Sequence, residues 1–181
     1  MLYLKKLTLS DGVETYEMLQ EILENDNGFH NSVNGMTYSR FRVWLETEYA
    51  RDNGKLENWM VPQSSYWLMN GGIPVGYGRI RHYLNDHLRE TSGHIGYAIR
   101  ESERGKGYGN EILRLLLNEC AQLGITEVQV GANKDNALSN KVILSNGGIL
   151  FEQSVSKNFY LFHIATREND RENHDNTGDM R

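Results

Sequence analysis

Residues 93–132 read GHIGYAIRESERGKGYGNEILRLLLNECAQLGITEVQVGA. Residues 93–99 have the pattern of a short strand, and apolar residues at helical spacing over 107–124 predict a long helix. Residues 126–132 then alternate apolar and polar side chains, which is typical of a second strand. A strand, a helix and a second strand in this order form a right-handed crossover with parallel strands. This unit therefore predicts a fold of the α/β class.

The chain before this unit begins with a predicted strand and an amphipathic helix. Residues 2–9 contain four leucines and no turn signal, so we expect a first strand there. Ser10 or Asp11 is expected to cap the following helix, and Glu14 lies in its first turn, where the helix dipole favours a carboxylate. The expected apolar face of this helix consists of Met18, Leu19, Ile22 and Leu23.

The next residues predict a loop, a second helix and a hairpin. Residues 25–36 are rich in Asn and Gly, which is typical of turns. Aromatic and aliphatic residues recur at helical spacing over about 38–51. Two apolar segments, 64–70 and 73–84, flank the turn Asn70-Gly71-Gly72, and this pattern strongly indicates a β-hairpin.

The chain after residue 132 completes the predicted domain. We expect a short helix over 136–146 and two strands at 149–155 and 158–165. The order β-α-α-β-β-β-α-β-α-β-β indicates a mixed sheet with helices, of the α/β or α+β class. Residues 1–165 thus form one predicted domain, and residues 166–181 are a charged tail with almost no apolar side chains, typical of a solvated terminus.

Composition narrows the possible partners. The chain has 181 residues, of which 24% are charged, and its net charge is -5. An acidic chain is a poor general partner for nucleic acid, because binding to phosphates needs clustered Lys and Arg. The single cysteine, Cys120, excludes an internal disulfide framework and any site with several cysteine ligands. There is no signal-peptide pattern and no segment with the ~20 apolar residues of a membrane span, so we expect a cytoplasmic protein without a membrane partner.

The segment Arg104-Gly105-Lys106-Gly107-Tyr108-Gly109 lies between a predicted strand and a predicted helix. Glycines in this position let the backbone turn sharply, and the unpaired N–H groups of a helix start favour a phosphate. The dinucleotide and protein-kinase loops do not fit, because the sixth position from Gly105 is Asn110. The P-loop does not fit either, because Gly107 follows the lysine where a hydroxyl is required. The spacing that fits is R-x-x-G-x-G.

This spacing resembles the pyrophosphate loop of the GNAT superfamily of N-acetyltransferases. The resemblance extends over residues 93–152. It implies a mixed, splayed sheet of about six to seven strands flanked by about four helices, with acetyl-CoA as the co-substrate and no metal. The residues that it implies in cofactor binding are Ala98, Ile99, Arg104, Gly105, Lys106, Gly107, Tyr108, Gly109, Asn136 and Ser139, with Asn133 as a further polar contact.

The resemblance also implies how these residues act. Strands 93–99 and 125–132 would splay apart, and the pantetheine arm would pair with the backbone near Ala98 and Ile99. A backbone N–H of the first strand would polarise the thioester carbonyl. Many relatives place a tyrosine acid at the position of Ile143, so this chain departs from the pattern. Tyr97, Tyr108 or solvent remain as sources of the proton for the leaving thiolate.

An alkylammonium acceptor must lose a proton before it attacks. His94 on the key strand and His82 on the preceding strand are the candidate bases, and the two would approach one another if their strands pair antiparallel. Asp86, His87 and Glu90 lie in the connecting turn, and Glu90 is a further candidate. Each histidine has an alternative interpretation as a hydrogen-bonded structural residue. No motif spacing supports a metal site at His82, Asp86 and His94.

Other conspicuous side chains have simpler interpretations. Cys120 lies on the apolar face of a predicted helix and is expected to be a core residue rather than a nucleophile. Tyr66, Trp67 and Trp44 are expected to be core aromatics, although any of them could line an acceptor pocket.

The sequence therefore predicts an acetyltransferase that moves an acetyl group to a primary amine by direct attack on the thioester. Two alternatives remain, a sensor that binds acyl-CoA without turnover and an interaction domain that kept only the fold. The loops 25–36 and 84–92 are expected to shape the acceptor site. The acceptor amine belongs to a small molecule or to a protein, with a small molecule expected first, and the acidic net charge mildly favours a cationic acceptor. A homodimer is possible.

Overall fold

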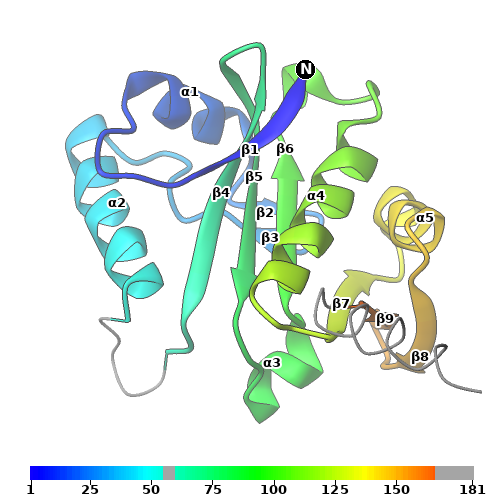
Figure 1. Cartoon of the computed structure of the whole chain (residues 1–181). Coiled ribbons are helices and arrows are strands. Elements are labelled where there is room, and N and C mark those ends of the chain that lie inside the picture. The colour runs from blue at the N-terminus through cyan, green and yellow to red at the C-terminus, as the bar shows by residue number, and fades with distance from the viewer. Residues whose placement is uncertain (55–59, 166–181) are drawn as a thin grey trace, which may run out of the picture.

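The computed structural model describes residues 1–54 and 60–165 (Figure 1). The predicted tail 166–181 lies outside these residues. The helices are α1 (Val13–Glu21), α2 (Tyr38–Asp52), α3 (Asp86–Thr91), α4 (Tyr108–Gln122) and α5 (Ala137–Ser145), with a 3₁₀ turn at Glu101–Glu103. The strands are β1 (Leu2–Lys6), β2 (Asn25–Asp26), β3 (Phe29–His30), β4 (Gln63–Asn70), β5 (Ile73–Arg81), β6 (Ile95–Ile99), β7 (Glu127–Asn133), β8 (Ile149–Gln153) and β9 (Lys157–His163).

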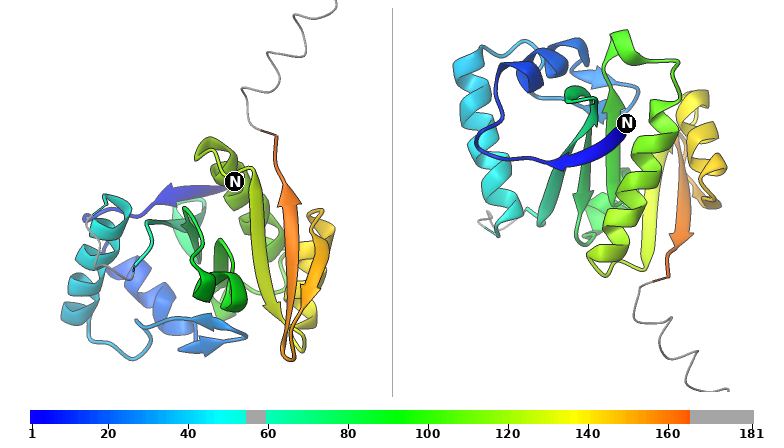
Figure 2. Two further views of the ribbon diagram at one scale, coloured as in Figure 1. Left: turned by 90° about the horizontal axis from the view of Figure 1, so that it is seen from below. Right: turned by 45° about the horizontal axis from the view of Figure 1, so that its top comes forward.

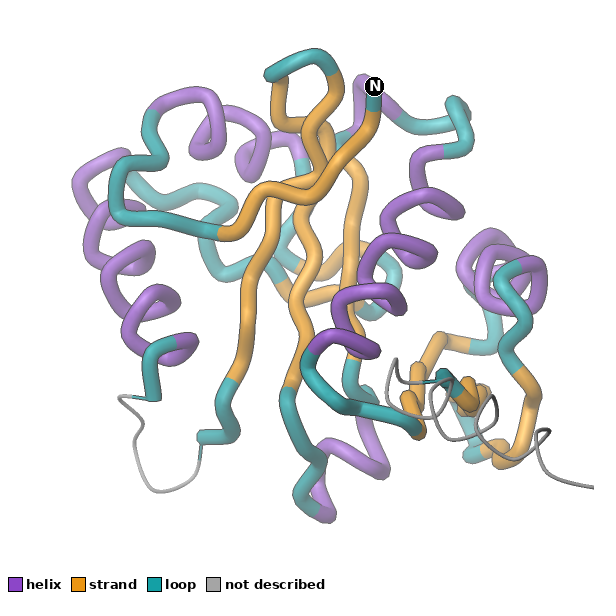
Figure 3. The backbone as a smooth tube through the Cα atoms, in the orientation of Figure 1, coloured by secondary structure: helices purple, strands orange, loops and turns teal. Residues whose placement is uncertain are grey.

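Two sheets lie side by side, and a small hairpin accompanies them. One sheet has the order β1-β4-β5-β6, the other has the order β7-β9-β8, and β2 pairs with β3. Helices α1 and α2 cover one face of the larger sheet and α4 covers the other (Figures 1 and 3). Hairpin β2–β3 extends from the side of α1 and α2 toward the smaller sheet (Figure 2). In the described ranges, no helix is long and apolar enough to cross a membrane.

Strand β4 shows why the larger sheet needs helices on both faces. Tyr66 and Leu68 belong to the apolar cluster under α4, whereas Trp67 and Met69 belong to the cluster under α1 and α2. Successive side chains of a strand point to opposite faces, so an uninterrupted apolar strand must be buried twice. The central part of the predicted hairpin therefore lies in the middle of the molecule.

The predicted cap of α1 is wrong. Helix α1 begins after Gly12 without a side-chain cap. The Asp11 carboxylate instead points inward, where Oδ2 accepts hydrogen bonds from Trp67 Nε1 (2.6 Å) and from the Thr8 backbone N–H (2.7 Å). Of the expected apolar face, Leu23 is exposed, whereas the other three residues are buried.

Two short elements occur where only loops were expected. The hairpin β2–β3 turns at Asn27 and Gly28, which both have positive φ (52° and 91°), and Asn-Gly is the preferred sequence for such a turn. Helix α3 begins after Asn85, whose Oδ1 accepts a hydrogen bond from the Leu88 N–H at 2.9 Å. A six-residue helix is too short to show a helical period in the sequence.

The α/β class and the splay between the two strands of the predicted unit are confirmed. The predicted parallel pairing differs, because β6 and β7 belong to different sheets and every ladder in the described chain is antiparallel. The two strands meet only at an isolated bridge between Gly93 and Val130. Gly93 has a φ of 83°, and a Cβ there would lie 2.4 Å from the Gln129 carbonyl oxygen. The close approach of the two sheets therefore depends on this glycine.

Candidate functional site

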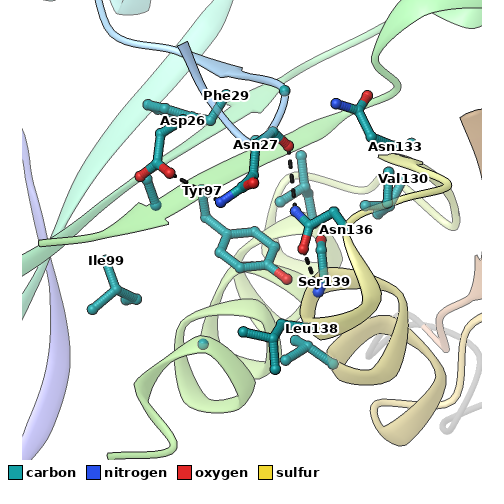
Figure 4. A pocket seen from close by; sticks show the side chains of 18 of the residues that line it. Asp26, Asn27, Phe29, Tyr97, Ile99, Val130, Asn133, Asn136, Leu138 and Ser139 are labelled. Carbon is teal, nitrogen blue, oxygen red and sulfur yellow. Dashed lines mark hydrogen bonds between the residues drawn. The ribbon is translucent and has the colours of Figure 1, made fainter. Parts of the chain in front are cut away.

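A cavity of about 600 Å³ occupies the gap where β6 and β7 diverge (Figure 4). Its walls come from the hairpin β2–β3, strands β5, β6 and β7, the segment that precedes α4, and the start of α5. Both segments that were expected to shape the acceptor site contribute to it, through Asp26 to Phe29 and through Thr91 and Ser92. Segments far apart in the sequence thus enclose one space.

The glycine-rich loop forms one end of this cavity. Gly105 and Gly107 have φ values of 77° and 81°, a conformation that favours glycine, and Gly107 is the residue before α4. Within the described ranges, no backbone N–H of residues 105–109 has an intramolecular acceptor. These donors and the positive end of the helix dipole make this part of the cavity wall favourable for an anion. Of the predicted cofactor residues, Lys106 alone does not line the cavity, and its Nζ lies 2.8 Å from Glu103 Oε2.

Arg104 joins this loop to the hairpin. Its guanidinium forms an ion pair with the Asp26 carboxylate, which is buried, and its Nε donates to the Ile99 carbonyl at 3.0 Å. The arginine of the motif therefore fixes the end of β6, the loop and hairpin β2–β3 relative to one another.

The start of α5 forms the opposite wall. Asn136 caps this helix, because its Oδ1 accepts a hydrogen bond from the Ser139 N–H at 3.0 Å, and its Nδ2 donates to the Asn27 carbonyl at 3.3 Å. Asn140 Nδ2 donates to the carbonyls of Asn133 (2.8 Å) and Asn136 (2.7 Å). These bonds fix the side chain of Asn136 and the backbone at Asn133, and both Asn136 and Ser139 line the cavity.

Tyr97 and Tyr108 were candidates for the acid that protonates the leaving thiolate, and their hydroxyls have different surroundings in the structure. Tyr97 extends from β6 into the cavity toward Ser139 (Figure 4), and its buried hydroxyl has no hydrogen-bond partner in the described chain. Burial raises the pKa of Tyr97 to about 12, so its proton is retained at neutral pH. The Tyr108 hydroxyl instead accepts a hydrogen bond from Asn70 Nδ2 at 3.0 Å. Of these two hydroxyls, only that of Tyr97 has no hydrogen-bond partner in the described chain.

Neither candidate histidine lines the cavity. His94 Nδ1 accepts a hydrogen bond from the Gln129 N–H at 3.0 Å, and burial lowers the pKa of His94 to about 4. His82 Nε2 lies 2.8 Å from Ser64 Oγ, whose hydroxyl also donates to Asp52.

The expected approach of the two histidines does not occur. The carbonyl of His94 pairs with the N–H of Arg81, so His82, one residue further on, turns to the opposite face of the sheet. Both histidines have structural contacts instead. In the described chain, no group of three or more His, Cys, Asp or Glu could hold a metal ion.

The remaining predictions concern core residues. Ile143 and Cys120 are completely buried, and burial raises the pKa of the Cys120 thiol to about 12. None of the three aromatic residues that were considered for the acceptor pocket lines the cavity, and Phe29 of β3 does so instead. Sequence reasoning also missed the cavity residues Asp26, Arg79 and Arg81. The alternation in Arg79-Ile80-Arg81 was the available signal, because it places both arginines on one face of the strand.

Comparisons with known proteins agree with this geometry. The family model described as "Acetyltransferase (GNAT) domain" matches residues 2–149. No curated protein matches the chain.

Several solved structures share the fold. The microcin C7 self-immunity acetyltransferase MccE, in complex with acetyl-CoA and AMP, is 19% identical with a TM-score of 0.67, over 90% of this chain and 92% of that one. A Salmonella typhimurium acetyltransferase that modifies the N-terminal serine of ribosomal protein L7/L12 is 18% identical with a TM-score of 0.63, over 91% and 95%. A GNAT acetyltransferase from Streptococcus pneumoniae is 16% identical with a TM-score of 0.61, over 91% and 100%.

The match of the family model spans most of the chain, and the similar structures cover almost all of its described part. The fold and the enzyme class that the glycine-rich loop predicted are therefore confirmed, and acetyl-CoA is the co-substrate of that class. The chain belongs to the GNAT family of acetyltransferases.

Proposed function

We propose that this protein transfers the acetyl group of acetyl-CoA to the primary amine of a small molecule by direct attack on the thioester. The observation that carries the proposal is the row of unpaired N–H groups over residues 105–109, at the edge of a cavity between two diverging strands. An anion site beside a long gap suits a ligand with a pyrophosphate at one end and a thioester at the other.

The residues present fit this ligand. The N–H groups of residues 105–109 would hold the pyrophosphate, and the edge of β6 at Ala98 and Ile99 would pair with the amide groups of the pantetheine arm. Asn136 and Ser139 would contact the arm from the opposite wall. Acetyl-CoA supplies an activated acyl group, and the residues of the cavity would bind and orient it.

The chemistry needs no acylated enzyme. The side chains that line the cavity include neither cysteine nor histidine, and Cys120 is buried in the core. The described lining therefore offers no nucleophile that is paired with a histidine base. The acceptor amine attacks in its neutral form, and its proton passes to water in the open cavity. The Tyr97 hydroxyl donates a proton to the leaving thiolate.

Calorimetric titration with acetyl-CoA tests this proposal. Gly107→Glu places a side chain and a negative charge at the start of α4, so it should abolish binding. The matched control is Gly124→Glu, because Gly124 also has a positive φ (75°) and open space around it but lies at the far end of α4. Binding by the native chain and by Gly124→Glu, but not by Gly107→Glu, supports the site.

Release of free thiol then distinguishes the enzyme from a sensor. Thiol release that depends on an added amine supports transfer. Binding of acetyl-CoA without thiol release across a broad set of amines indicates a sensor. No binding by the native chain contradicts both functions.

A further inference from the structure

Two arginines of β5 enter the cavity from the face of the sheet that α1 and α2 cover. Arg79 and Arg81 both line the cavity, and they share a face of the strand with the buried Tyr77. In the described chain, neither Arg79 nor Arg81 forms an ion pair with a carboxylate, whereas other part-buried arginines do, such as Arg100 with Glu21 and Arg104 with Asp26.

Neighbouring residues determine where the Arg79 side chain lies. Gly96 lies opposite it on β6 and leaves room for the side chain, because a Cβ at Gly96 would be 3.2 Å from Arg79 Nε. The guanidinium carbon lies 4.6 Å from the centre of the Phe29 ring, an arrangement that orients the cation. The buried Nε has no hydrogen-bond partner in the described chain.

Arg81 lies deeper along the same face. Its Nη1 donates to the Gly93 carbonyl at 2.8 Å. Burial, with smaller contributions from Arg79 and Arg51, lowers the pKa of Arg81 to about 9. The nearby Glu48 offsets these charges only in part, because its carboxylate is also bound by Arg51 (3.0 Å) and Gln63 (2.8 Å). A buried cation without a counter-ion is unfavourable, so this pair is suited to an anion from outside the chain.

The whole cavity is electropositive. Its acidic lining residues, Asp26 and Glu103, are both ion-paired. Its basic lining residues are Arg79, Arg81, Arg104, Lys141 and Lys157. The net charge of -5 belongs to the whole chain, and this space differs from it in sign.

The two arginines lie beyond the place where the acyl group would arrive. Ala98 is opposite Tyr77 on β5, so Arg79 and Arg81 follow two and four residues further along the strand. With about 3.4 Å per residue, they lie roughly 7 and 14 Å beyond Ala98. This part of the cavity is on the opposite side of the thioester position from the glycine-rich loop.

We propose that Arg79 and Arg81 bind an oxyanion of the acceptor, so that the acceptor is a small amine that also carries a carboxylate or a phosphate. This inference rests on the proposed function and replaces the expectation of a cationic acceptor. Guanidinium groups bind both kinds of oxyanion in the same planar geometry.

Matched pairs of amines test the inference. Thiol release from acetyl-CoA is measured with amino acids against their carboxamides, and with O-phosphoethanolamine against ethanolamine, at equal concentrations of neutral amine. Hydrogen bonds to charged groups contribute about 1.5–3 kcal/mol, so the anionic member should have a kcat/KM about 10- to 100-fold higher in at least one type of pair. The type of pair identifies the oxyanion.

Substitutions test whether the preference for the anionic amine depends on Arg79 and Arg81. Arg79→Gln and Arg81→Gln should each reduce the preference, and Arg79→Lys should keep part of it. The control is Arg114→Gln, which removes an exposed arginine of α4 that pairs with Glu111. The affinity for acetyl-CoA, measured by calorimetry, should not change in any of these variants.

The outcomes separate this inference from the proposed function. The inference is overturned if both amines of every matched pair react equally, or if neither reacts. It is also overturned if the preference for the anionic amine survives both glutamine substitutions. None of these results affects the binding of acetyl-CoA. A large loss of acetyl-CoA affinity in Arg79→Gln or Arg81→Gln also overturns it, because the arginines would then serve the donor. Failure of the native chain to bind acetyl-CoA overturns both.

Discussion

His94 and Gln129 are joined by two hydrogen bonds at the point where the two sheets separate. The His94 N–H donates to the Gln129 carbonyl at 2.7 Å, and the Gln129 N–H donates to His94 Nδ1 at 3.0 Å. A third bond, from the Gly131 N–H to the Ser92 carbonyl at 3.0 Å, completes the contact. In the described chain this contact lies just before β6, beyond it β6 and β7 belong to separate sheets, and the cavity lies in the gap between them.

Gly93→Ala should disrupt this contact. The new Cβ would lie 2.4 Å from the Gln129 carbonyl oxygen, and φ at this residue is 83°. Since the obstructing atoms belong to the backbone, the two sheets must move apart. We expect a loss of at least about 2 kcal/mol in the free energy of unfolding, measured with urea.

Gly124→Ala is the matched control for this experiment. Gly124 has a similar φ of 75°, but nothing lies within 4 Å of its Cβ position, so this variant measures only the cost of the backbone conformation. We expect a loss of about 1–2 kcal/mol there. Equal losses in the two variants would show that the approach of the sheets does not depend on Gly93.

His94 should make the protein less stable in mild acid. Burial lowers its pKa to about 4 in the folded state, against 6.5 in the unfolded chain. Between these values the unfolded state binds more protons, so stability falls as the pH drops from about 6.5 toward 4 and levels off below that range. The free energy of unfolding, measured with urea at several pH values, should show this slope.

His94→Gln should reduce this slope, and the remainder would come from His82, whose pKa burial also lowers, whereas the same substitution at the exposed His87 should keep it. The variant also tests the catalytic role that the sequence suggested for His94. We expect His94→Gln to lower the free energy of unfolding and to leave kcat within a few-fold of the native value. A kcat loss of 100-fold or more in a folded His94→Gln variant would instead show that His94 acts as the base.

The glycine-rich loop could be predicted from sequence because its function is local. The positive φ of Gly107 and the helix that follows it are properties of a few consecutive residues. The ion pair of Asp26 with Arg104 could not be predicted, because it joins residues 78 positions apart. His94 shows the same limit, since it was expected on the strand but lies just before β6, and its ring is held by a residue 35 positions away.

The acceptor end of the cavity illustrates a different limit. The alternation of Arg79 and Arg81 shows that both lie on one face of a strand, but only the packed helices decide which face borders the cavity. Asp26 and Phe29 reach the cavity because they flank the turn of hairpin β2–β3, whose Asn-Gly turn residues are evident in the sequence. Its docking against Asn136 depends on contacts between distant segments.

Cys120 should be unreactive in the folded protein. Its side chain is completely buried, and burial raises the pKa of the thiol to about 12, so the reactive thiolate is almost absent at neutral pH. We expect a thiol reagent such as an aromatic disulfide to modify the native chain only as fast as it unfolds. In denaturant the same reagent should modify one thiol per chain, because the sequence contains one cysteine. Rapid modification under native conditions would contradict the core position of Cys120.

Tyr97→Phe should separate proton donation from binding. The hydroxyl is buried without a partner in the described chain, so its removal leaves the packed ring in place and should leave the melting temperature unchanged or slightly higher. The affinity for acetyl-CoA should change little. Because the thiolate of coenzyme A is a good leaving group, we expect kcat to fall by only about tenfold, below the usual range for a general acid. Tyr108→Phe is the control, since its hydroxyl is bound to Asn70. An unchanged kcat in Tyr97→Phe would mean that water protonates the thiolate.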